Sequence, residues 1–218
     1  MKTTKCLGYR MKKVMSSLIN NDQTGFLQNR YIGENIMKMI EILEYTDSEN
    51  IAALSIFIDF EKAFDRLEWK FIQKVLTSFN FGPNFKFWID TIYRNSSRQI
   101  LNNCWATAPF TWSRGVRQEC PLSQYLFVIC AEILGILIRH NTQIEGINIA
   151  GKEYRISQYA NDANLTIKAS EACLQEVIEV FEWFERISGL KVNYDKSEIM
   201  PIGILNKRTV TVLCSAEF

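Results

Sequence analysis

The sequence predicts an α+β fold in which a largely antiparallel sheet carries helices on one face. Two observations support this prediction. Stretches with apolar residues at helical spacing lie between short apolar runs that suit strands, and a tight turn joins two of these runs, which makes them antiparallel. The 218 residues are 47% hydrophobic and 22% charged, a composition typical of a globular protein that buries a sizeable core.

The central element is a strand expected over Ile51–Ile58, which is apolar except for Ser55. Polar residues bound this run on both sides, and such a run is typical of a strand buried on both faces. Asp59 follows it directly. A carboxylate at the end of a rigid, buried strand has little structural reason to be there, and it is well placed to hold an ion.

Two amphipathic helices are expected before this strand, with a polar turn at residues 20–25 between them. Their apolar stripes are Leu7, Met11, Val14, Met15 and Leu18 in the first, and Ile32, Ile36, Met39, Ile40 and Leu43 in the second. After the strand, helical spacing predicts a helix over Lys62–Phe79 and a short helix around Trp88–Tyr93. Residues 96–112 have weak periodicity, which indicates strands or loop.

The second half of the chain begins with an apolar helix that has Pro121 in its first turn and ends near Arg139. Alternating residues then predict strands on either side of Ala150-Gly151, and two more strands joined by a tight turn at Asn161-Asp162. Ser170 is the expected N-cap of a last amphipathic helix, which Gly189 ends. The turn at 161–162 places a second carboxylate at a hairpin tip.

Charge is unevenly distributed along the chain, although the formal net charge is only +1. Residues 1–38 carry seven basic and two acidic side chains, and residues 86–118 carry five basic and one acidic. These two basic regions flank the acidic strand end, an arrangement that suits a phosphate backbone near a metal site. Ordinary solvated faces are the alternative interpretation.

The cysteine pattern indicates neither a zinc site nor a disulfide framework, because the six residues include no C-x-x-C pair. They are Cys6, Cys104, Cys120, Cys130, Cys173 and Cys214. A reduced, intracellular compartment, cytoplasmic or nuclear, is therefore expected. We expect no secretion signal and no membrane span, because the longest apolar run, Tyr125–Ile138, is short and contains Glu132. His140 is interpreted as a helix-end residue rather than a base.

Five segments occur in the order found in the reverse transcriptases of LINE-type, non-LTR retrotransposons, and the resemblance covers roughly residues 7–200. They are Gln23–Phe26 with Arg30 (QTGF…R), Asp59–Asp65 (DFEKAFD), Gly115–Ser123 (GVRQECPLS), Tyr159–Asp162 (YAND), and Gly189–Asn193 with Lys196-Ser197 (GLKVN…KS). The resemblance implies a right-hand polymerase palm with part of the fingers. Residues 1–50 would be the partial fingers, 51–203 the palm and 204–218 a divergent tail.

The resemblance also implies RNA-directed DNA synthesis on an RNA template and DNA primer from deoxynucleoside triphosphates, with two Mg²⁺ ions in an intact family member. Asp59, Asp162 and Asn161 are the catalytic positions, and the Phe60 carbonyl is a further metal ligand. The implied nucleotide-binding residues are Phe64 as a gate against a ribose 2′-hydroxyl, Gln118, Arg117 and Lys196. Phe64 could also be plain core, while Glu61, Lys62 and Asp65 are expected at the surface or in ion pairs. No membrane and no obligate protein partner is evident.

Several residues depart from the family pattern. Asn161 replaces the first aspartate of the Y-A-D-D box and removes one charge from the metal site, and Glu119 replaces a glycine near the path of the triphosphate. Gln124 replaces a proline, and residues 204–218 do not resemble the primer-gripping segment. Neither a thumb nor an upstream endonuclease is recognised in the sequence. These departures predict a truncated and partly degenerate copy whose activity is impaired.

Two function classes therefore stay open. The first is a reverse transcriptase palm with impaired activity, and the second is a non-catalytic nucleic-acid-binding or structural remnant of a retrotransposon. A nucleotide cyclase with a palm-like fold is a weaker third possibility, because its chemistry does not require the segment that contains Gln118. In the first class, the carboxyl groups of Asp59 and Asp162 should lie close enough to share a divalent ion.

Overall fold

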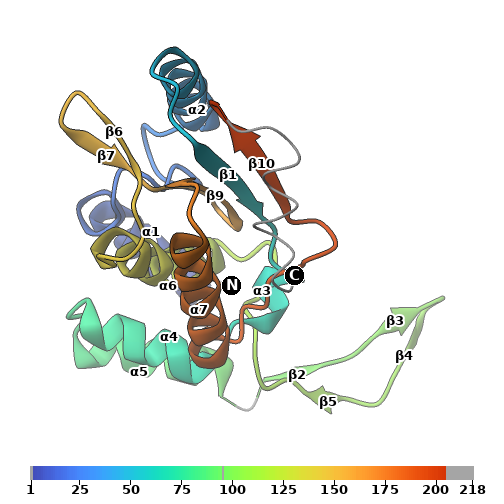
Figure 1. Ribbon diagram of the computed structural model, residues 1–218. Helices are drawn as coiled ribbons and strands as arrows, with labels where there is room; N and C mark the ends of the chain where they lie inside the picture. Colours follow the sequence, from blue (N-terminus) through green and yellow to red (C-terminus); the bar gives the residue numbers. More distant parts are fainter. Residues whose placement is uncertain (1, 95, 205–218) are drawn as a thin grey trace.

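A four-stranded antiparallel sheet forms the centre of the computed structural model, which describes residues 2–94 and 96–204. Its strands lie in the order β10 (Glu198–Ile202), β1 (Ala53–Ile58), β9 (Asp162–Lys168) and β8 (Ile156–Tyr159), and each neighbouring pair is antiparallel. Figure 1 shows β1 between β10 and β9. The predicted central strand and the predicted α+β class are both confirmed.

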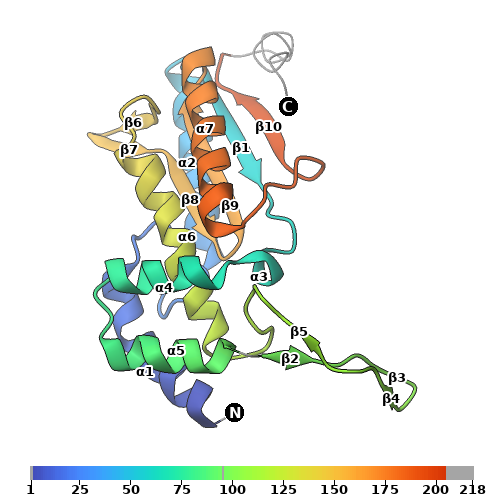
Figure 2. The ribbon, with the colours of Figure 1, turned by 90° about the horizontal axis from the view of Figure 1, so that it is seen from below.

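One face of this sheet packs against helices and forms the main core. Leu54, Ile56 and Ile58 of β1 alternate inward with Leu165 and Ile167 of β9, and all are buried. The helices of this core are α1 (Lys2–Leu18), α4 (Trp69–Ser78), α5 (Pro83–Tyr93), α6 (Ser123–His140) and α7 (Glu171–Ser188). Figure 2 shows α6 and α7 running across the sheet, with α4 and α5 below them.

The opposite face of the sheet is contacted by α2 (Ile32–Ser48). Ile42 packs with Ala53 and Ile202 in a small second core, together with Ile147 of the hairpin β6 (Ile147–Ile149) and β7 (Lys152–Tyr154). The predicted helix is confirmed, but much of its predicted stripe is not buried, since Ile32, Ile36 and Ile40 are exposed. The first half of α2 instead lines a hollow beside the end of β1 and the start of β9.

The single helix expected over Lys62–Phe79 is wrong, because the chain forms α3 (Ala63–Arg66) and α4 with a break at Leu67. Segment 115–116 explains the break. The Gly115 N–H donates to the Leu67 carbonyl at 2.7 Å and the Val116 N–H donates to the Phe64 carbonyl at 2.6 Å, so these carbonyls bond outside the helix.

Two predicted turns need a correction of register. The β8–β9 turn consists of Ala160 and Asn161, and Asp162 is already the first residue of β9, paired with Tyr159. Ala160 has φ 57°, the left-handed value that this kind of two-residue turn requires at its first position. Pro121 lies in a turn just before α6 rather than in the helix, because the Ser123 N–H bonds back to the Cys120 carbonyl at 3.0 Å.

Other sequence predictions are confirmed. The Ser170 side chain caps α7 by accepting from the Cys173 N–H at 3.1 Å, and Gly189 ends the helix with φ 77°. His140 is the last residue of α6 and bonds to the Ile136 carbonyl at 3.0 Å. Ala150-Gly151 forms the β6–β7 turn with both φ angles positive.

Residues 97–111 form a long hairpin that leaves the body of the protein, as Figures 1 and 2 show. Its base pairs β2 (Ser97–Arg98) with β5 (Phe110–Thr111), and its tip pairs β3 (Leu101–Asn102) with β4 (Trp105–Ala106). The expectation of strands or loop in this part of the chain is confirmed as strands.

By length and composition alone, α6 could cross a membrane, and among the described helices it is the one that meets this test. However, 67% of it is buried inside the fold, where it contacts α1, α4 and α7. The packing of a core helix therefore accounts for its apolar surface. The cysteines at 6, 104, 120, 130 and 173 are free thiols, and Cys214 lies outside the described residues.

Candidate active site

Asp59 and Asp162 lie opposite each other at adjacent strand ends. The β1–β9 register pairs Ile58 with Ala163, so the next pair along the ladder is Asp59 with Asp162, both on the face that does not carry the main core. Both residues line a hollow of about 330 Å³, together with Lys196. Partial burial, and then the negative charge of Asp59, raise the pKa of the Asp162 carboxyl. The effect of one carboxylate on the other indicates their proximity.

The segment that follows α7 fixes Asp59. The Asn193 side chain donates from Nδ2 to Asp59 Oδ2 at 3.0 Å, and its backbone N–H donates to the Asp59 carbonyl at 2.9 Å. The Asp59 N–H donates to Ser197 Oγ at 3.2 Å. Sequence reasoning placed Asn193 and Ser197 in a motif without a role, and their role here is to orient the first carboxylate.

The Phe60 carbonyl faces away from the segment that contains Val192. Phe60 forms an antiparallel bridge with Val192, in which the flanking residues make the hydrogen bonds: Glu61 N–H to the Lys191 carbonyl and Asn193 N–H to the Asp59 carbonyl, both at 2.9 Å. In such a pair the central residue directs its own N–H and C=O to the other side. That side is the one on which β9 begins.

Asn161 stands beside Asp162 on the hairpin tip. Its Nδ2 donates to Asp162 Oδ1 at 3.3 Å, so the amide bonds to the carboxylate where a second aspartate would repel it. Asn161 also lines a second hollow, of about 600 Å³, with Asp59 and four other residues that the sequence predicts for the metal or nucleotide site. These four are Phe60, Phe64, Gln118 and Lys196.

The hairpin tip is held from below by Gln23, a residue whose role the sequence analysis missed. Gln23 is 0% exposed, and its Oε1 accepts from the Ala160 N–H at 3.0 Å and from the Gly25 N–H at 2.8 Å. Its Nε2 donates to the Ala160 carbonyl at 3.3 Å. A Cβ on Gly25 would lie 2.2 Å from the Ala160 nitrogen, which explains a glycine at this position. The sequence analysis identified Gln23–Phe26 as a family segment but did not assign Gln23 a role.

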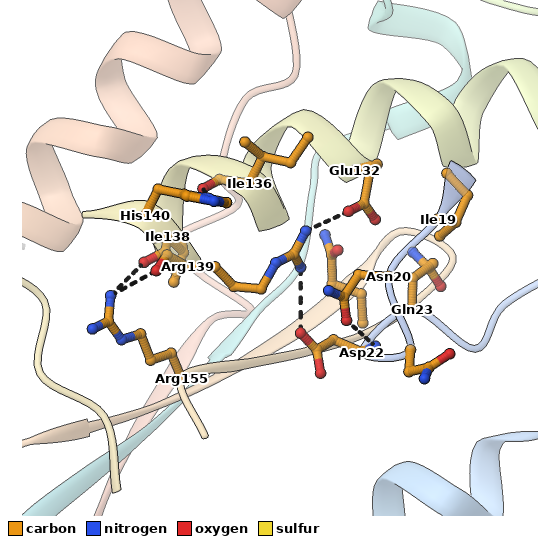
Figure 3. Close-up of polar contacts among 12 residues, drawn as sticks. Ile19, Asn20, Asp22, Gln23, Glu132, Ile136, Ile138, Arg139, His140 and Arg155 are labelled. Carbon is orange, nitrogen blue, oxygen red and sulfur yellow. Dashed lines mark hydrogen bonds and ion pairs between the residues drawn. The ribbon is translucent and has the colours of Figure 1, made fainter. Parts of the chain in front are cut away.

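A partly buried ion pair attaches the Gln23 segment to α6 (Figure 3). Arg139 pairs with Glu132 on its own helix and with Asp22, at 3.3 Å, beside Gln23. Burial raises the pKa of the Glu132 carboxyl, although the Arg139 charge acts in the opposite direction. Arg155 donates from Nη1 to carbonyl oxygens at the C-terminal end of α6, at positions 138, 139 and 141. The hairpin with Asp162 therefore rests on a rigid support.

Phe64 separates two hollows. Its ring stacks on Phe127 with centroids 4.7 Å apart and meets the edge of Phe26 at 6.4 Å. On one side lies the hollow with Asp59, and on the other a hollow of about 530 Å³ lined by Phe26, Arg117, Gln118 and Glu119. Phe64 is therefore half-buried against the core and also lines both hollows, and its role as a gate stays a prediction.

Glu119 occupies a backbone position that favours glycine. Its φ of 59° is left-handed, and its side chain is exposed at the hollow that Arg117 and Gln118 also line. The expectation that this position is better without a Cβ therefore has a structural reason. Of the residues expected at the surface or in ion pairs, Glu61 pairs with Arg66 and with Lys191.

The donor set at the strand ends suits a hard divalent cation. It comprises the carboxylates of Asp59 and Asp162, the Phe60 carbonyl and the Asn161 amide, which are oxygen donors of the kind that Mg²⁺ prefers. Within residues 2–94 and 96–204, no three acidic, histidine or cysteine side chains gather into one metal-binding group. With Asn161 in place of a carboxylate, the site has two charged donors.

The antiparallel sheet, its helix-covered face and the carboxylates at its strand ends define a palm domain of the kind found in nucleic-acid polymerases. Over residues 2–214 the chain matches the family described as reverse transcriptase (RNA-dependent DNA polymerase), and it belongs to this family.

Two retrotransposon proteins are among its relatives. The chain is 29% identical over 195 residues to the Transposon TX1 uncharacterized 149 kDa protein of Xenopus laevis, which covers 88% of this chain and 15% of that protein. It is 26% identical over 206 residues to the Retrovirus-related Pol polyprotein from type-2 retrotransposable element R2DM of Drosophila melanogaster, covering 94% and 19% respectively. The chain thus spans less than a fifth of each relative, and its resemblance to LINE-type, non-LTR reverse transcriptases is confirmed.

Solved structures with a similar fold include two telomerases. The telomerase of Candida tropicalis superposes with a TM-score of 0.65 at 10% identity, covering 89% of this chain and 33% of that one. The telomerase of Candida albicans gives a TM-score of 0.64 at 11% identity, covering 90% and 34%. At this level of identity the likeness concerns the fold.

Proposed function

We propose that this chain is the palm, with part of the fingers, of a LINE-type reverse transcriptase that extends a DNA primer along an RNA template. The observation that carries the proposal is the apposition of Asp59 and Asp162 at two strand ends, beside a hollow lined by Phe64, Gln118 and Lys196. Residues 1–50 contribute the partial fingers and residues 51–203 the palm. In this proposal the protein acts inside the cell, in the cytoplasm or nucleus.

Asp59, Asp162 and the Phe60 carbonyl would hold Mg²⁺, with two ions in an intact member of the family. Bound Mg²⁺ activates the attacking 3′-hydroxyl and offsets the charge of the leaving pyrophosphate. The protein contributes rigidity: Asn193 fixes the Asp59 carboxylate, and Gln23 fixes the turn that carries Asp162. A preorganised pair of carboxylates needs little rearrangement when an ion binds.

The incoming deoxynucleoside triphosphate would occupy the hollow of about 600 Å³. Lys196 is exposed there as a cation for its phosphates, and Gln118 lines the same hollow as a hydrogen-bonding contact. Phe64 is packed against Phe127, so its ring can act as a fixed wall that crowds a ribose 2′-hydroxyl. Arg117 lines the adjoining hollow, where it can hold template or substrate phosphates.

Activity is impaired for two reasons in this proposal. The amide of Asn161 binds Mg²⁺ more weakly than a carboxylate, and the loss of one electrostatic contact at a reacting centre commonly costs on the order of 10²–10³ in rate. Glu119 adds a negative charge and a strained backbone at the hollow next to the nucleotide site. The same two residues favour the second candidate, a non-catalytic nucleic-acid-binding or structural remnant.

Primer extension on a primed RNA template with Mg²⁺ and deoxynucleotides separates the two candidates. We expect little extension by the unmodified chain, and a gain with Asn161→Asp that stays below full activity because Glu119 remains in place. Asp59→Asn in the Asn161→Asp background is the matched control, and it should abolish the gain. Robust extension by the unmodified chain would contradict the impairment. No extension by Asn161→Asp together with Glu119→Gly would favour the non-catalytic remnant.

A further inference from the structure

The hairpin of residues 97–111 is anchored at its base and exposed at its tip. At the base, the Trp112 N–H donates to the Ser96 carbonyl at 3.1 Å, and the Trp112 ring packs at 5.7 Å from Trp69 and 6.2 Å from Tyr93. At the middle, Thr107 bonds back to Ile100 through its N–H and its hydroxyl, each at 3.0 Å. Hydrogen bonds along the hairpin and ring contacts at its base therefore support this projection.

The turn at the hairpin tip places a tryptophan in solvent. Asn103 and Cys104 both have positive φ angles, 47° and 67°, which is the geometry of the tight turn that matches the twist of a hairpin. Trp105 follows this turn and is 82% exposed, and Leu101 is 73% exposed. Ile100 and Phe110 are also exposed. An indole at a rigid tip loses little conformational freedom when a flat partner stacks on it.

The charge of this part of the chain selects the kind of partner. Between Asp90 and Glu119 the sequence contains no carboxylate, whereas it contains four arginines, at positions 94, 98, 114 and 117. Arg94 is paired with Asp90 on the preceding helix, so the other three arginines carry the charge argument. Arg117 also lines the hollow beside Phe64, so the basic segment continues from the hairpin to the candidate active site. Exposed aromatic rings combined with an excess of positive charge are the features of surfaces that bind single-stranded nucleic acid.

We propose that the hairpin 97–111 is a second nucleic-acid contact, on which unpaired bases of a single strand stack against Trp105. The neighbouring arginines attract the backbone of that strand, and the indole provides a π-face that every base can use. The contact lies outside the carboxylate site and needs no metal. It rests on the proposed function only in assuming that the chain handles nucleic acid.

The test is the affinity of the whole chain for a fluorescently labelled single strand of deoxythymidine or uridine, measured by anisotropy with a chelator present. Trp105→Ala should weaken binding about ten-fold, because a stacked base contributes 1–3 kcal/mol. Trp105→Phe should keep most of the affinity. The matched control is Trp183→Ala on α7, where a 44% exposed tryptophan lies among glutamates, and it should change nothing. Thermal unfolding of each variant verifies that the fold is retained.

Several results would overturn the proposal. Unchanged affinity of Trp105→Ala would do so, as would an equal loss with Trp183→Ala. Two other results would assign the tip to a different partner, if Trp105→Ala leaves oligonucleotide binding unchanged. A change in molar mass in light scattering would indicate a second copy of the chain, and a change in sedimentation with anionic vesicles would indicate a membrane. The two proposals fail separately. The binding test contains a chelator and needs no metal, so a failure of primer extension does not affect it. Unchanged binding by Trp105→Ala would in turn say nothing against the site at Asp59 and Asp162.

Discussion

Replacing Glu119 with glycine should improve both the stability and the nucleotide affinity of the protein. The structure supplies two separate reasons. Glu119 has φ 59°, a left-handed conformation that costs a residue with a Cβ about 1 kcal/mol and costs glycine almost nothing. Its carboxylate is exposed at the hollow that Arg117 and Gln118 line, where a triphosphate would approach.

The two effects have different sizes and different readouts. Relief of about 1 kcal/mol corresponds to a rise in melting temperature of roughly 2–4 °C for a domain of this size. Removing one negative charge roughly 7 Å from a phosphate group in a water-like medium changes the interaction by about 0.6 kcal/mol for each phosphate charge. With one or two phosphate charges at that distance, triphosphate binding should tighten about three- to eight-fold. Calorimetric melting and a nucleotide titration in low salt measure these quantities.

Two control variants separate the backbone effect from the charge effect. Glu119→Ala removes the charge and keeps a Cβ, so it should gain affinity without the rise in melting temperature. Ala150→Gly relieves a left-handed residue, with φ 51°, in the β6–β7 turn, so it should gain stability without affinity. Equal melting temperatures of Glu119→Gly and Glu119→Ala would refute the backbone argument. Unchanged nucleotide affinity in both would show that the side chain turns away from the site.

Two further predictions concern the hairpin that carries Asp162. Gln23→Ala should lower the free energy of unfolding by about 2–4 kcal/mol in a urea titration, because it removes three buried hydrogen bonds and leaves the Ala160 N–H unpaired. The control Gln175→Ala, at an exposed position, should cost less than about 0.5 kcal/mol. Equal costs would contradict the role of Gln23 in holding the turn. Burial and the charge of Asp59 raise the pKa of Asp162, so the charged form of this side chain opposes folding when no metal is bound. Asp162→Asn should therefore be more stable than the wild type at neutral pH. This gain in stability should vanish as the pH falls through the raised pKa to below the ordinary value of 3.8. A gain that persists in acid would contradict the assignment.

The sequence predicted the parts of the site that depend on local pattern. A buried apolar run that ends on Asp59 predicts a strand-end carboxylate, and alternating residues around Asn161 predict a hairpin with a second carboxylate. Both predictions hold in the structure, because burial and period-2 alternation are properties of neighbouring residues.

The parts that failed depend on residues far apart in the chain. The turn lies one position earlier than predicted. Gln23 binds both the N–H and the carbonyl of Ala160, a contact across 137 residues, and so supports a left-handed alanine there. The helix break at Leu67 has a similar cause, since the Gly115 N–H donates a hydrogen bond to the Leu67 carbonyl. No local pattern around Ala160 or Leu67 indicates these partners.

The exposed half of α2 is a different kind of failure. Helical spacing of Ile32, Ile36 and Ile40 correctly predicts the helix, and it also predicts that this face packs against the core. In the structure all three are exposed, and Ile32 and Ile36 line the hollow beside Asp59 and Asp162 instead. Periodicity identifies an apolar face, but it does not specify whether a core or an open hollow lies against it.

The central claim is that Asp59 and Asp162 together hold a divalent cation, and a Mg²⁺ titration by calorimetry tests it most directly. The wild-type chain should bind weakly, Asn161→Asp more tightly, and Asp59→Asn or Asp162→Asn in that background should each remove the gain. Asp195→Asn, which removes a carboxylate that lines the hollow of about 600 Å³ but is not one of the predicted metal ligands, is the matched control and should bind like its parent. Mg²⁺ affinity that does not respond to Asp59 or Asp162 would contradict the account.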